Sequence, residues 1–361
     1  MSRFFSSRHA KLVPYTPGEQ PRDMQFIKLN TNESPFPPPK SVLDVLRSEL
    51  PEQLNLYSDP TCLRLREALA NYHGVDVENV SVANGSDETL AFAFLAYGSE
   101  QSHFVFPDIT YGLYDVVSVL YGIPYSTVPL KDTLEINPDD YLNVRCNVVL
   151  SNPNAPTGIV LPLSEIERIA VSNTDNIVVV DEAYADFWGQ SAISLTAKYD
   201  NLLVVRTYSK SRNMAGARIG YAIGNKALIY DLEAIRYSIN PYNLNSLTLA
   251  AGAAAFDDND YYEDCWATIC ATREETKTAL RSMGFTVTDS QANFIFANHT
   301  GFTGPALYSK LRERGILVRN LSHPRIRDWL RITVGTGEQM RALLSAINEI
   351  LEEREDEKRE N

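Results

Sequence analysis

IVVVDEAYADF, residues 177–187, joins four consecutive β-branched apolar residues to an acidic one, Asp181. A strand that is apolar on both faces is typical of a parallel sheet covered by helices on both sides. Similar runs recur in the chain with helical patterns between most of them, namely VSVA (80–83), HFVF (103–106), NVVL (147–150) and LLVV (202–205). The sequence therefore predicts an α/β fold with a mostly parallel central sheet.

The chain of 361 residues divides into three expected parts. Residues 1–45 are rich in proline, which predicts an extended N-terminal arm that packs on the site and on the small domain. Residues 46–253 contain the apolar runs and form the expected large domain. Residues 254–361 contain a long helical pattern, short strands and a final amphipathic helix, which predict a smaller α+β domain.

Charge and composition narrow the class of protein. The net charge of −13 argues against nucleic acid or an anionic membrane as a partner. The N-terminal sequence lacks the apolar run of a signal peptide, and no stretch of about 18 apolar residues suggests a membrane span. The four cysteines and five histidines are scattered, so we expect no metal site and a reducing compartment. We predict a soluble, cytoplasmic protein.

Chemically distinct side chains follow the five apolar runs. Ligands of parallel α/β sheets bind beyond the carboxyl ends of the strands. Each feature alone has an ordinary structural explanation, such as a capped turn, a core tyrosine or a surface lysine. Together they form a set: a helix start suited to phosphate, an aromatic ring, an amide, an acid and a lysine. In chain order these are Gly85, Ser86 and Asp87, then Tyr111, Asn154, Asp181 and Lys210.

The lysine and the acid fit pyridoxal 5′-phosphate. Its aldehyde forms a Schiff base with a lysine amine, which we assign to Lys210. Its ring nitrogen withdraws electrons when protonated, and a buried carboxylate such as Asp181 holds that proton.

Neighbouring residues supply the remaining contacts. Asn154 and Tyr184 are neutral donors suited to the phenolic oxygen of the cofactor. Thr207, Ser209 and Arg218 lie beside the lysine and supply hydroxyls and a guanidinium for its phosphate.

At these motifs the chain resembles the fold-type I pyridoxal-phosphate aminotransferases, and among them the histidinol-phosphate aminotransferase family. The acid motif VDEAYADF (180–187) and the lysine motif SKSRNMAGARIGY (209–221) are specific for the class. PYTPGEQ (14–20), TNESPF (31–36) and PYNLN (241–245) point to the subfamily. One departure is Ala155, where much of the class has Asn directly before PTG. We assign the phenolic contact to Asn154, with Tyr184 and Asn152 as alternatives.

The resemblance implies roles for residues outside the strand ends. Arg331 lies among apolar residues in WLRITVG, and a buried guanidinium is costly unless it meets an anion, here a substrate anion. Arg319 would make a second contact with the substrate phosphate, and a surface role stays open as its alternative. The resemblance also assigns three residues to the substrate site, Tyr15, Asn32 and Asn293. Tyr57 would reach the cofactor phosphate of a neighbouring subunit, which implies a homodimer with shared active sites.

The implied activity is transamination in histidine biosynthesis. L-Histidinol phosphate would donate its amino group and 2-oxoglutarate would accept it, giving imidazole acetol phosphate and L-glutamate. Lys210, Asp181 and Tyr184 would be the catalytic residues. An aromatic amino-acid aminotransferase and a threonine-phosphate decarboxylase share the same motifs and stay open as alternatives. A dinucleotide-binding module is disfavoured because no G-x-G-x-x-G opens a helix after the first strand. A non-catalytic pyridoxal-binding regulator is disfavoured because the lysine is intact and no basic patch is visible.

Overall fold

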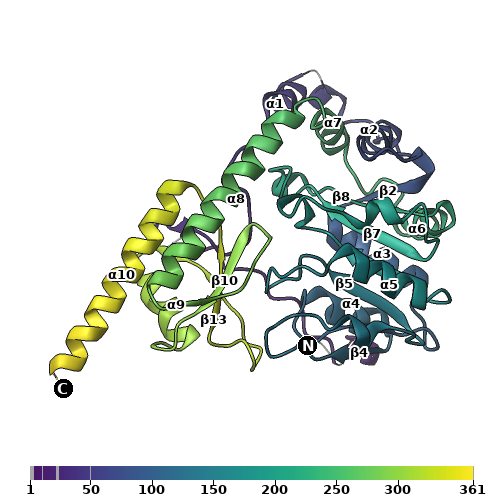
Figure 1. Cartoon of the computed structure of the whole chain (residues 1–361). Coiled ribbons are helices and arrows are strands. Elements are labelled where there is room, and N and C mark those ends of the chain that lie inside the picture. The colour runs from purple at the N-terminus through teal and green to yellow at the C-terminus, as the bar shows by residue number, and fades with distance from the viewer. Residues whose placement is uncertain (1–3, 10, 22–23, 49, 361) are drawn as a thin grey trace.

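The computed structural model of the chain describes residues 4–9, 11–21, 24–48 and 50–360. A larger part with a seven-stranded sheet and a smaller part with a four-stranded sheet are linked through the long helix α8 (Asn259–Ser282) (Figure 1). The other α-helices of the described ranges are α1 (Lys40–Leu46), α2 (Leu63–His73), α3 (Ser86–Tyr97), α4 (Leu113–Tyr121), α5 (Leu163–Ser172), α6 (Lys226–Ile239), α7 (Ser246–Ala254), α9 (Gly304–Glu313) and α10 (Gly337–Glu360).

The large sheet is mostly parallel. Its strands lie in the order β2 (Val80–Ala83), β8 (Gly220–Gly224), β7 (Leu202–Thr207), β6 (Val178–Asp181), β5 (Asn147–Ser151), β3 (Phe104–Pro107) and β4 (Tyr125–Val128). Only β8 runs antiparallel to its neighbours in this sheet. The five predicted apolar runs correspond to β2, β3, β5, β6 and β7, so the predicted fold class is confirmed.

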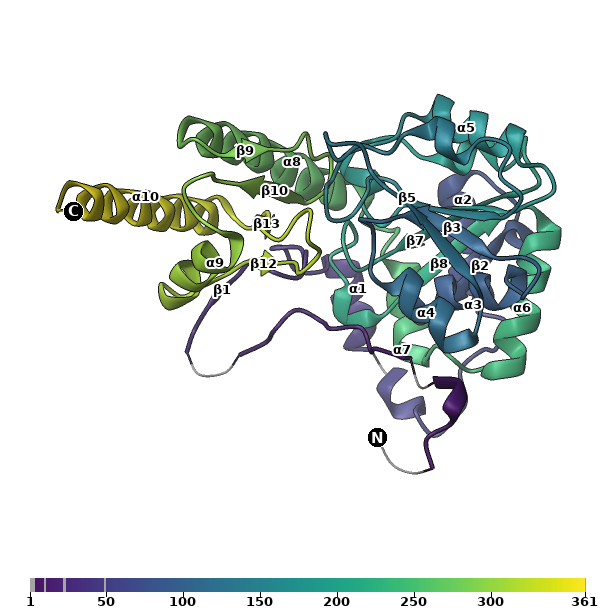
Figure 2. The same ribbon diagram turned by 90° about the horizontal axis from the view of Figure 1, so that it is seen from below.

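Helices cover both faces of this sheet, as the continuously apolar strands predict. Val178 and Val180 of β6 pack in one apolar core with α2 and α5, whereas Val179 packs in another with α3, α4 and α6. Figure 2 shows α5 on one side of the sheet and α3, α4 and α6 on the other. Because side chains alternate along a strand, the face on which each strand-end residue lies is fixed by its position.

This alternation determines which polar residues share a site. Asp181, two residues after Val179, lies on the α4 side, where it meets Tyr114. The side chains of Glu182 and Arg206 lie on the opposite face of the sheet, where they form an ion pair of 3.8 Å. One face at the strand ends therefore carries the predicted acid, and the other carries a structural ion pair.

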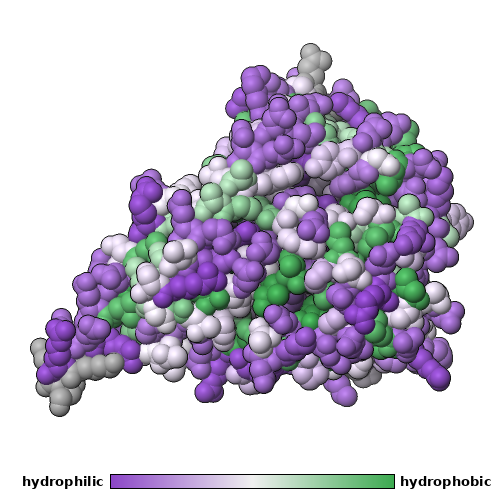
Figure 3. Space-filling view, viewed as in Figure 1, coloured by the Kyte–Doolittle hydropathy of each residue, from purple (hydrophilic) through white to green (hydrophobic). Residues whose placement is uncertain are grey.

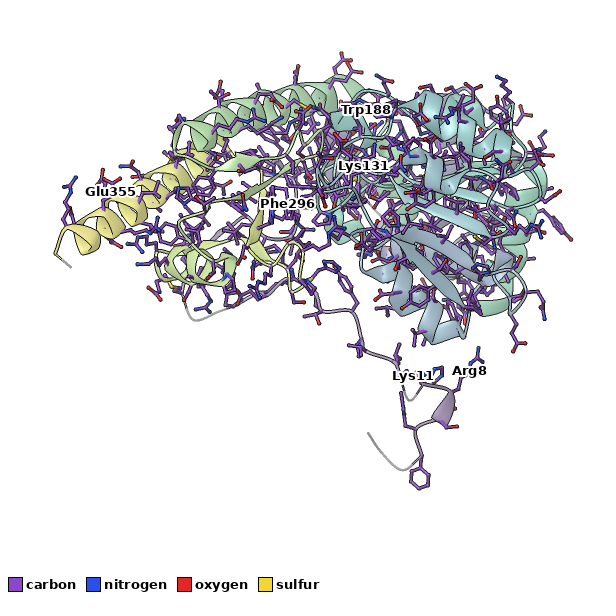
Figure 4. The ribbon with its side chains drawn as sticks, turned by 60° about the horizontal axis from the view of Figure 1, so that its bottom comes forward. Arg8, Lys11, Lys131, Trp188, Phe296 and Glu355 are labelled. Carbon is purple, nitrogen blue, oxygen red and sulfur yellow. The ribbon has the colours of Figure 1, made fainter. Side chains whose placement is uncertain are left out.

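The small sheet is antiparallel and packs against the large part. Its strands lie in the order β12 (Arg319–Asn320), β13 (Trp329–Thr333), β10 (Phe294–Asn298) and β9 (Thr286–Val287). Phe294 packs in a core with residues of α8, α9 and α10. Phe296, labelled in Figure 4, stacks on Trp329 with ring centroids 4.9 Å apart and joins the core of the large part. One face of the small sheet thus packs in the core of the small part, and the other face packs against the large part and fixes the position of the small part.

The N-terminal arm contacts both parts of the molecule. Its strand β1 (Ile27–Lys28) pairs in parallel with β11 (Ile316–Leu317), beside the small sheet. Arg8 donates a hydrogen bond to the carbonyl oxygen of Tyr121 at the end of α4. Figure 2 shows the dark purple arm running from the small part toward the large one.

Two strands of the large sheet were not expected from the sequence. β4 is an edge strand with mostly exposed side chains, so it lacks the apolar run that marks its neighbours. β8 has glycine at both ends and pairs antiparallel, so it does not follow the pattern of a parallel strand. The outer end of α10, which includes Glu355, extends away from the body and is hydrophilic (Figures 3 and 4). Within the described ranges no helix has the length and apolar character needed to cross a membrane.

Candidate active site

A cavity of about 530 Å³ lies where strand ends of the large sheet meet the arm and the small sheet. Parallel sheets bind ligands at this edge, as the sequence analysis assumed. The predicted residues that line it are Tyr15, Asn32, Ser86, Asp87, Tyr111, Asp181, Tyr184, Thr207, Ser209, Lys210, Arg218, Arg319 and Arg331. Four predicted residues are not in its wall, namely Gly85, Asn154, Asn293 and Tyr57.

Asp181 ends β6 and is almost entirely buried, with 3% of its surface exposed. One carboxylate oxygen accepts a hydrogen bond of 2.8 Å from the hydroxyl of Tyr114, and the other accepts one of 3.2 Å from the backbone N–H of Ala183. Burial raises the pKa of Asp181 to about 6, against the opposing effect of the Tyr114 hydrogen bond. Asp181 is therefore ionised at neutral pH in an apolar setting, where a cationic ring nitrogen would stabilise it.

Lys210 follows β7 and points its amine into the cavity. Its Nζ donates a hydrogen bond of 3.2 Å to the carbonyl oxygen of Thr31 on the arm. Burial, followed by the positive charge of Arg331, lowers the pKa of Lys210 to about 8. Near neutral pH a useful fraction of the amine is therefore neutral, as a nucleophile or a general base requires.

The start of α3 forms an anion seat beneath Arg218. Gly85 precedes the helix with φ +86°, and a Cβ atom there would lie 2.4 Å from Nη2 of Arg218. A Cβ atom on Gly220 would lie 2.3 Å from the backbone nitrogen of Ser86. Nη1 of Arg218 lies 3.4 Å from Oγ of Ser209. The two glycines thus let backbone and guanidinium approach closely enough to surround one small anion.

Asp87 borders this seat. Its carboxylate accepts a hydrogen bond of 2.8 Å from the hydroxyl of Tyr111 and pairs with Arg218 at 3.4 Å. The rings of Tyr111 and Tyr15 meet edge to face with centroids 5.8 Å apart. These contacts fix one aromatic wall of the cavity beside the anion seat.

Asn154 lies outside the cavity wall, and its amide is already bonded. Its Nδ2 donates to the carbonyl oxygen of Ile109 at 3.1 Å, and its Oδ1 accepts from Thr110 at 3.1 Å. Asn152, one of the two alternatives for the phenolic contact, lies in the same loop and bonds the backbone of Leu161 with both ends of its amide.

Of the three residues considered for the phenolic contact, Tyr184 is the one that lines the cavity. Its hydroxyl oxygen accepts a hydrogen bond of 3.0 Å from Nδ2 of Asn32, which leaves its own proton free to be donated. Burial raises the pKa of Tyr184, so the hydroxyl keeps its proton. Of the residues considered for the phenolic contact, the geometry favours Tyr184 over the two asparagines.

Arg331 lies on β13 with an incomplete set of partners. One terminal nitrogen donates to the carbonyl oxygen of Asn30 at 3.1 Å, whereas the buried Nε makes no hydrogen bond. Burial lowers the pKa of Arg331, and within the described ranges no carboxylate forms an ion pair with it. A cation held this way is costly unless an anion joins it.

The other predicted substrate residues differ in their placement. Arg319 lines the cavity and donates to the carbonyl oxygens of Thr16 and Pro17 at 2.7 and 3.0 Å, which holds the arm over the site. Asn293 is fully buried and donates to the carbonyl oxygen of Asn32 at 3.0 Å. Asn293 therefore positions Asn32 from behind the wall.

Tyr57 lies away from the cavity of its own chain. The residue is 83% exposed, and its ring stacks on that of Tyr242 with centroids 4.4 Å apart. It borders a separate surface hollow of about 220 Å³. Any contact between Tyr57 and a cofactor would have to be made in another copy of the chain.

Some residues of the site were missed by the sequence analysis. Tyr114 holds Asp181, and Thr31 accepts from Lys210. Glu33, Ser151 and the arm residues Pro17, Gly18 and Gln20 also line the cavity. The only sequence signal for Tyr114 is its position three residues after Tyr111 at the start of α4, which gives no indication of Asp181 as a partner.

Known proteins match the chain over nearly its whole length. The family model for aminotransferase class I and II matches residues 24–347. A histidinol-phosphate aminotransferase of Brachyspira hyodysenteriae is 45% identical over 97% of this chain and 99% of its own length. Histidinol-phosphate aminotransferase 2 of Thiobacillus denitrificans is 48% identical over 96% of this chain and 97% of its own.

A solved structure has the same fold. The histidinol-phosphate aminotransferase of Sinorhizobium meliloti, in complex with pyridoxal 5′-phosphate, superposes with a TM-score of 0.87 over 98% of both chains at 24% identity. The family match and the two relatives at 45% and 48% identity decide the assignment. The chain belongs to the histidinol-phosphate aminotransferase family, within the class I and II aminotransferases.

Proposed function

We propose that this chain transfers the amino group of L-histidinol phosphate to 2-oxoglutarate, giving imidazole acetol phosphate and L-glutamate. The activity is a transamination, as its family membership establishes. The observation that carries the choice of substrate is a pair of arginines, Arg319 and Arg331, that line the cavity apart from the anion seat at Arg218. A phosphorylated amine and a dicarboxylic acceptor both bring the anions that such a pair requires.

The cofactor is pyridoxal 5′-phosphate, and the residues of the cavity fit it. Lys210 would bond its aldehyde, Asp181 would meet its ring nitrogen, and Ser86 and Arg218 would hold its phosphate. The close approach allowed by Gly85 supports this fit. When bound, the cofactor withdraws electrons from the substrate carbon that bears the amino group.

The chain's own residues would manage the protons. Lys210, with a pKa of about 8, would take a proton from the substrate carbon that bears the amino group and would deliver it to the former aldehyde carbon of the cofactor. Asp181 favours a positive charge beside it because its carboxylate is buried among few other donors. Tyr184 would donate its hydroxyl proton to the phenolic oxygen while Asn32 fixes its direction.

Arg331→Ala should weaken the binding of both substrates. Arg331 would receive one anion from the amino donor and another from the acceptor in turn, so both Michaelis constants should rise about 10–100-fold, the loss expected for a charge-assisted hydrogen bond. Steady-state kinetics with each substrate varied would measure this. Arg327→Ala is a matched control, because Arg327 precedes the same strand and is exposed. A rise for only one substrate would contradict the shared role.

A substrate panel would test the choice of donor. Single-turnover conversion should be fastest with histidinol phosphate, compared with phenylalanine and threonine phosphate at equal concentrations. Faster turnover of phenylalanine would favour the aromatic aminotransferase alternative. Release of carbon dioxide from threonine phosphate would favour the decarboxylase.

We also propose a cytoplasmic homodimer. Tyr57 is exposed near other exposed apolar residues, Leu54, Leu56 and Leu63, which supports a second copy covering this surface. Tyr57 would then reach the cofactor phosphate of the partner. Light scattering that gave the mass of a single chain at micromolar concentration would refute the dimer. The free cysteines of the described chain fit a reducing compartment.

A further inference from the structure

The arm segment Thr31–Asn32–Glu33 lies against the amine of Lys210. The carbonyl oxygen of Thr31 accepts the hydrogen bond from Nζ at 3.2 Å. Glu33 lines the same cavity, and its Oε2 accepts from Lys28 Nζ at 2.6 Å and from Thr31 Oγ1 at 2.8 Å. Its second oxygen, Oε1, makes no hydrogen bond within the described part of the chain. The segment therefore bonds the amine through the Thr31 carbonyl and holds a fixed carboxylate in the wall of the same cavity.

Among the described residues, none of the other charged groups around Lys210 offers a carboxylate oxygen without a hydrogen-bond partner. They are Arg331 on the small sheet, Arg218 after β7, Asp87 on α3 and Asp181 at the end of β6. The two arginines repel an ammonium group. Both oxygens of Asp87 are engaged by Tyr111 and Arg218, and both oxygens of Asp181 by Tyr114 and Ala183. Glu33 differs from Asp87 and Asp181 because one of its carboxylate oxygens, Oε1, has no hydrogen-bond partner in the described part of the chain.

We propose that Thr31 and Glu33 form the resting site of the free ε-ammonium group of Lys210. They hold the amine as a cation whenever it is not bonded to the cofactor, including the interval in which it carries the substrate's proton. Glu33 is thus a positioning residue that acts through Lys210. The holding of the amine while it carries the substrate's proton rests on the proposed function. The holding of the free amine in the absence of cofactor does not.

The sign of the effect follows from electrostatics. A nearby carboxylate favours the charged form of an amine, so Glu33 raises the pKa of Lys210 against burial and Arg331, which lower it. The influence is mutual. Burial raises the pKa of Glu33, but its hydrogen bonds to Lys28 and Thr31 and the charges of Lys28 and Lys210 lower it overall. Removing the carboxylate should therefore lower the pKa of Lys210 below its present value of about 8.

Competitive acetylation would measure this directly. Full-length protein without cofactor is treated with trace acetic anhydride at a series of pH values, and the peptide that contains Lys210 is quantified by mass spectrometry. In the wild type, acetylation should rise with a midpoint near pH 8. In Glu33→Gln the midpoint should fall by about one pH unit, the shift expected for loss of a nearby opposite charge. Glu33→Ala provides a second neutral variant, and Glu33→Asp should restore most of the shift.

Glu19→Gln is the matched control. Glu19 lies on the same arm and pairs with Arg312 at 3.6 Å, so this variant removes one negative charge without altering the Thr31–Glu33 segment. Its midpoint should stay at the wild-type value. An unchanged midpoint in both neutral Glu33 variants, or an equal fall in Glu19→Gln, would overturn the proposal. Because acetylation needs no substrate and no cofactor, its result is independent of whether histidinol phosphate is the donor.

Discussion

Lys210→Ala should abolish transamination, with a loss of about 10⁴-fold or more in turnover. Lys210 would contribute both the covalent bond to the cofactor and the base that moves the substrate's proton, and general base catalysis alone contributes up to about 10⁴-fold. Within the described cavity wall no second lysine is present to replace it. The cofactor phosphate would still meet Ser86 and Arg218, so the variant should bind the cofactor without the covalent bond.

Borohydride reduction would separate these two effects. Reduction of the wild type should attach the cofactor permanently to the peptide that contains Lys210, and reduction of Lys210→Ala should leave it removable by denaturation. Lys226→Ala is the control, since Lys226 lies exposed at the start of α6 and pairs with Asp76 at 2.8 Å. Labelling of a different lysine in the wild type, or turnover above about a hundredth of normal in Lys210→Ala, would contradict the assignment.

The parallel strands were predictable because burial on both faces requires an apolar residue at every position of the strand. Val178 to Val180 are apolar at every position, which a half-exposed strand would not be. β4 lacks such a continuous apolar run, since an edge strand can expose its side chains. The pairing of β1 with β11 joins segments almost 290 residues apart, and two residues of each carry too little pattern to indicate it. Local sequence thus predicts buried elements better than pairings formed by tertiary contact.

The strand-end rule also located much of the cavity wall. Asp181 and Lys210 were predicted to lie together because each follows a strand of one sheet, and both line the cavity. Asn154 also follows a strand, but its loop turns the amide toward Ile109 and Thr110. Such a turn depends on loop geometry that strand position does not specify. The roles assigned to the residues of the wall stay predictions.

The partners of the two central residues were the hardest to foresee. Tyr114 reaches Asp181 from α4, and the carbonyl oxygen of Thr31 meets Lys210 from the arm. Neither contact follows from the position of a residue at a strand end, because each brings a different element over the sheet. The sequence therefore indicates which groups do the chemistry more readily than which groups orient them.

Asp181→Asn should slow the chemical step about 10²–10³-fold while leaving the cofactor bound, the loss typical of removing one preorganised electrostatic contact. The asparagine side chain has nearly the same shape. Its Oδ1 can still accept from the N–H of Ala183, and its Nδ2 can donate to the hydroxyl oxygen of Tyr114, so the fold should be retained. A neutral amide, however, cannot favour a proton on the ring nitrogen, and the substrate carbon would lose part of its electron withdrawal. The single-turnover rate of the first half-reaction and the fraction of bound cofactor would be measured together.

Glu182→Gln distinguishes this effect from the loss of any buried carboxylate. Glu182 is the next residue and equally buried, but it lies on the opposite face, where it accepts from the backbone N–H of Ala192 at 2.6 Å. Burial raises its pKa to about 7, so the glutamine resembles a form that Glu182 already adopts near neutral pH. Its single-turnover rate should stay within about tenfold of the wild type, a loss no larger than that of one ordinary hydrogen bond. Equal losses in the two variants would mean that charge burial near β6, and not the contact of Asp181 with the ring, governs the rate.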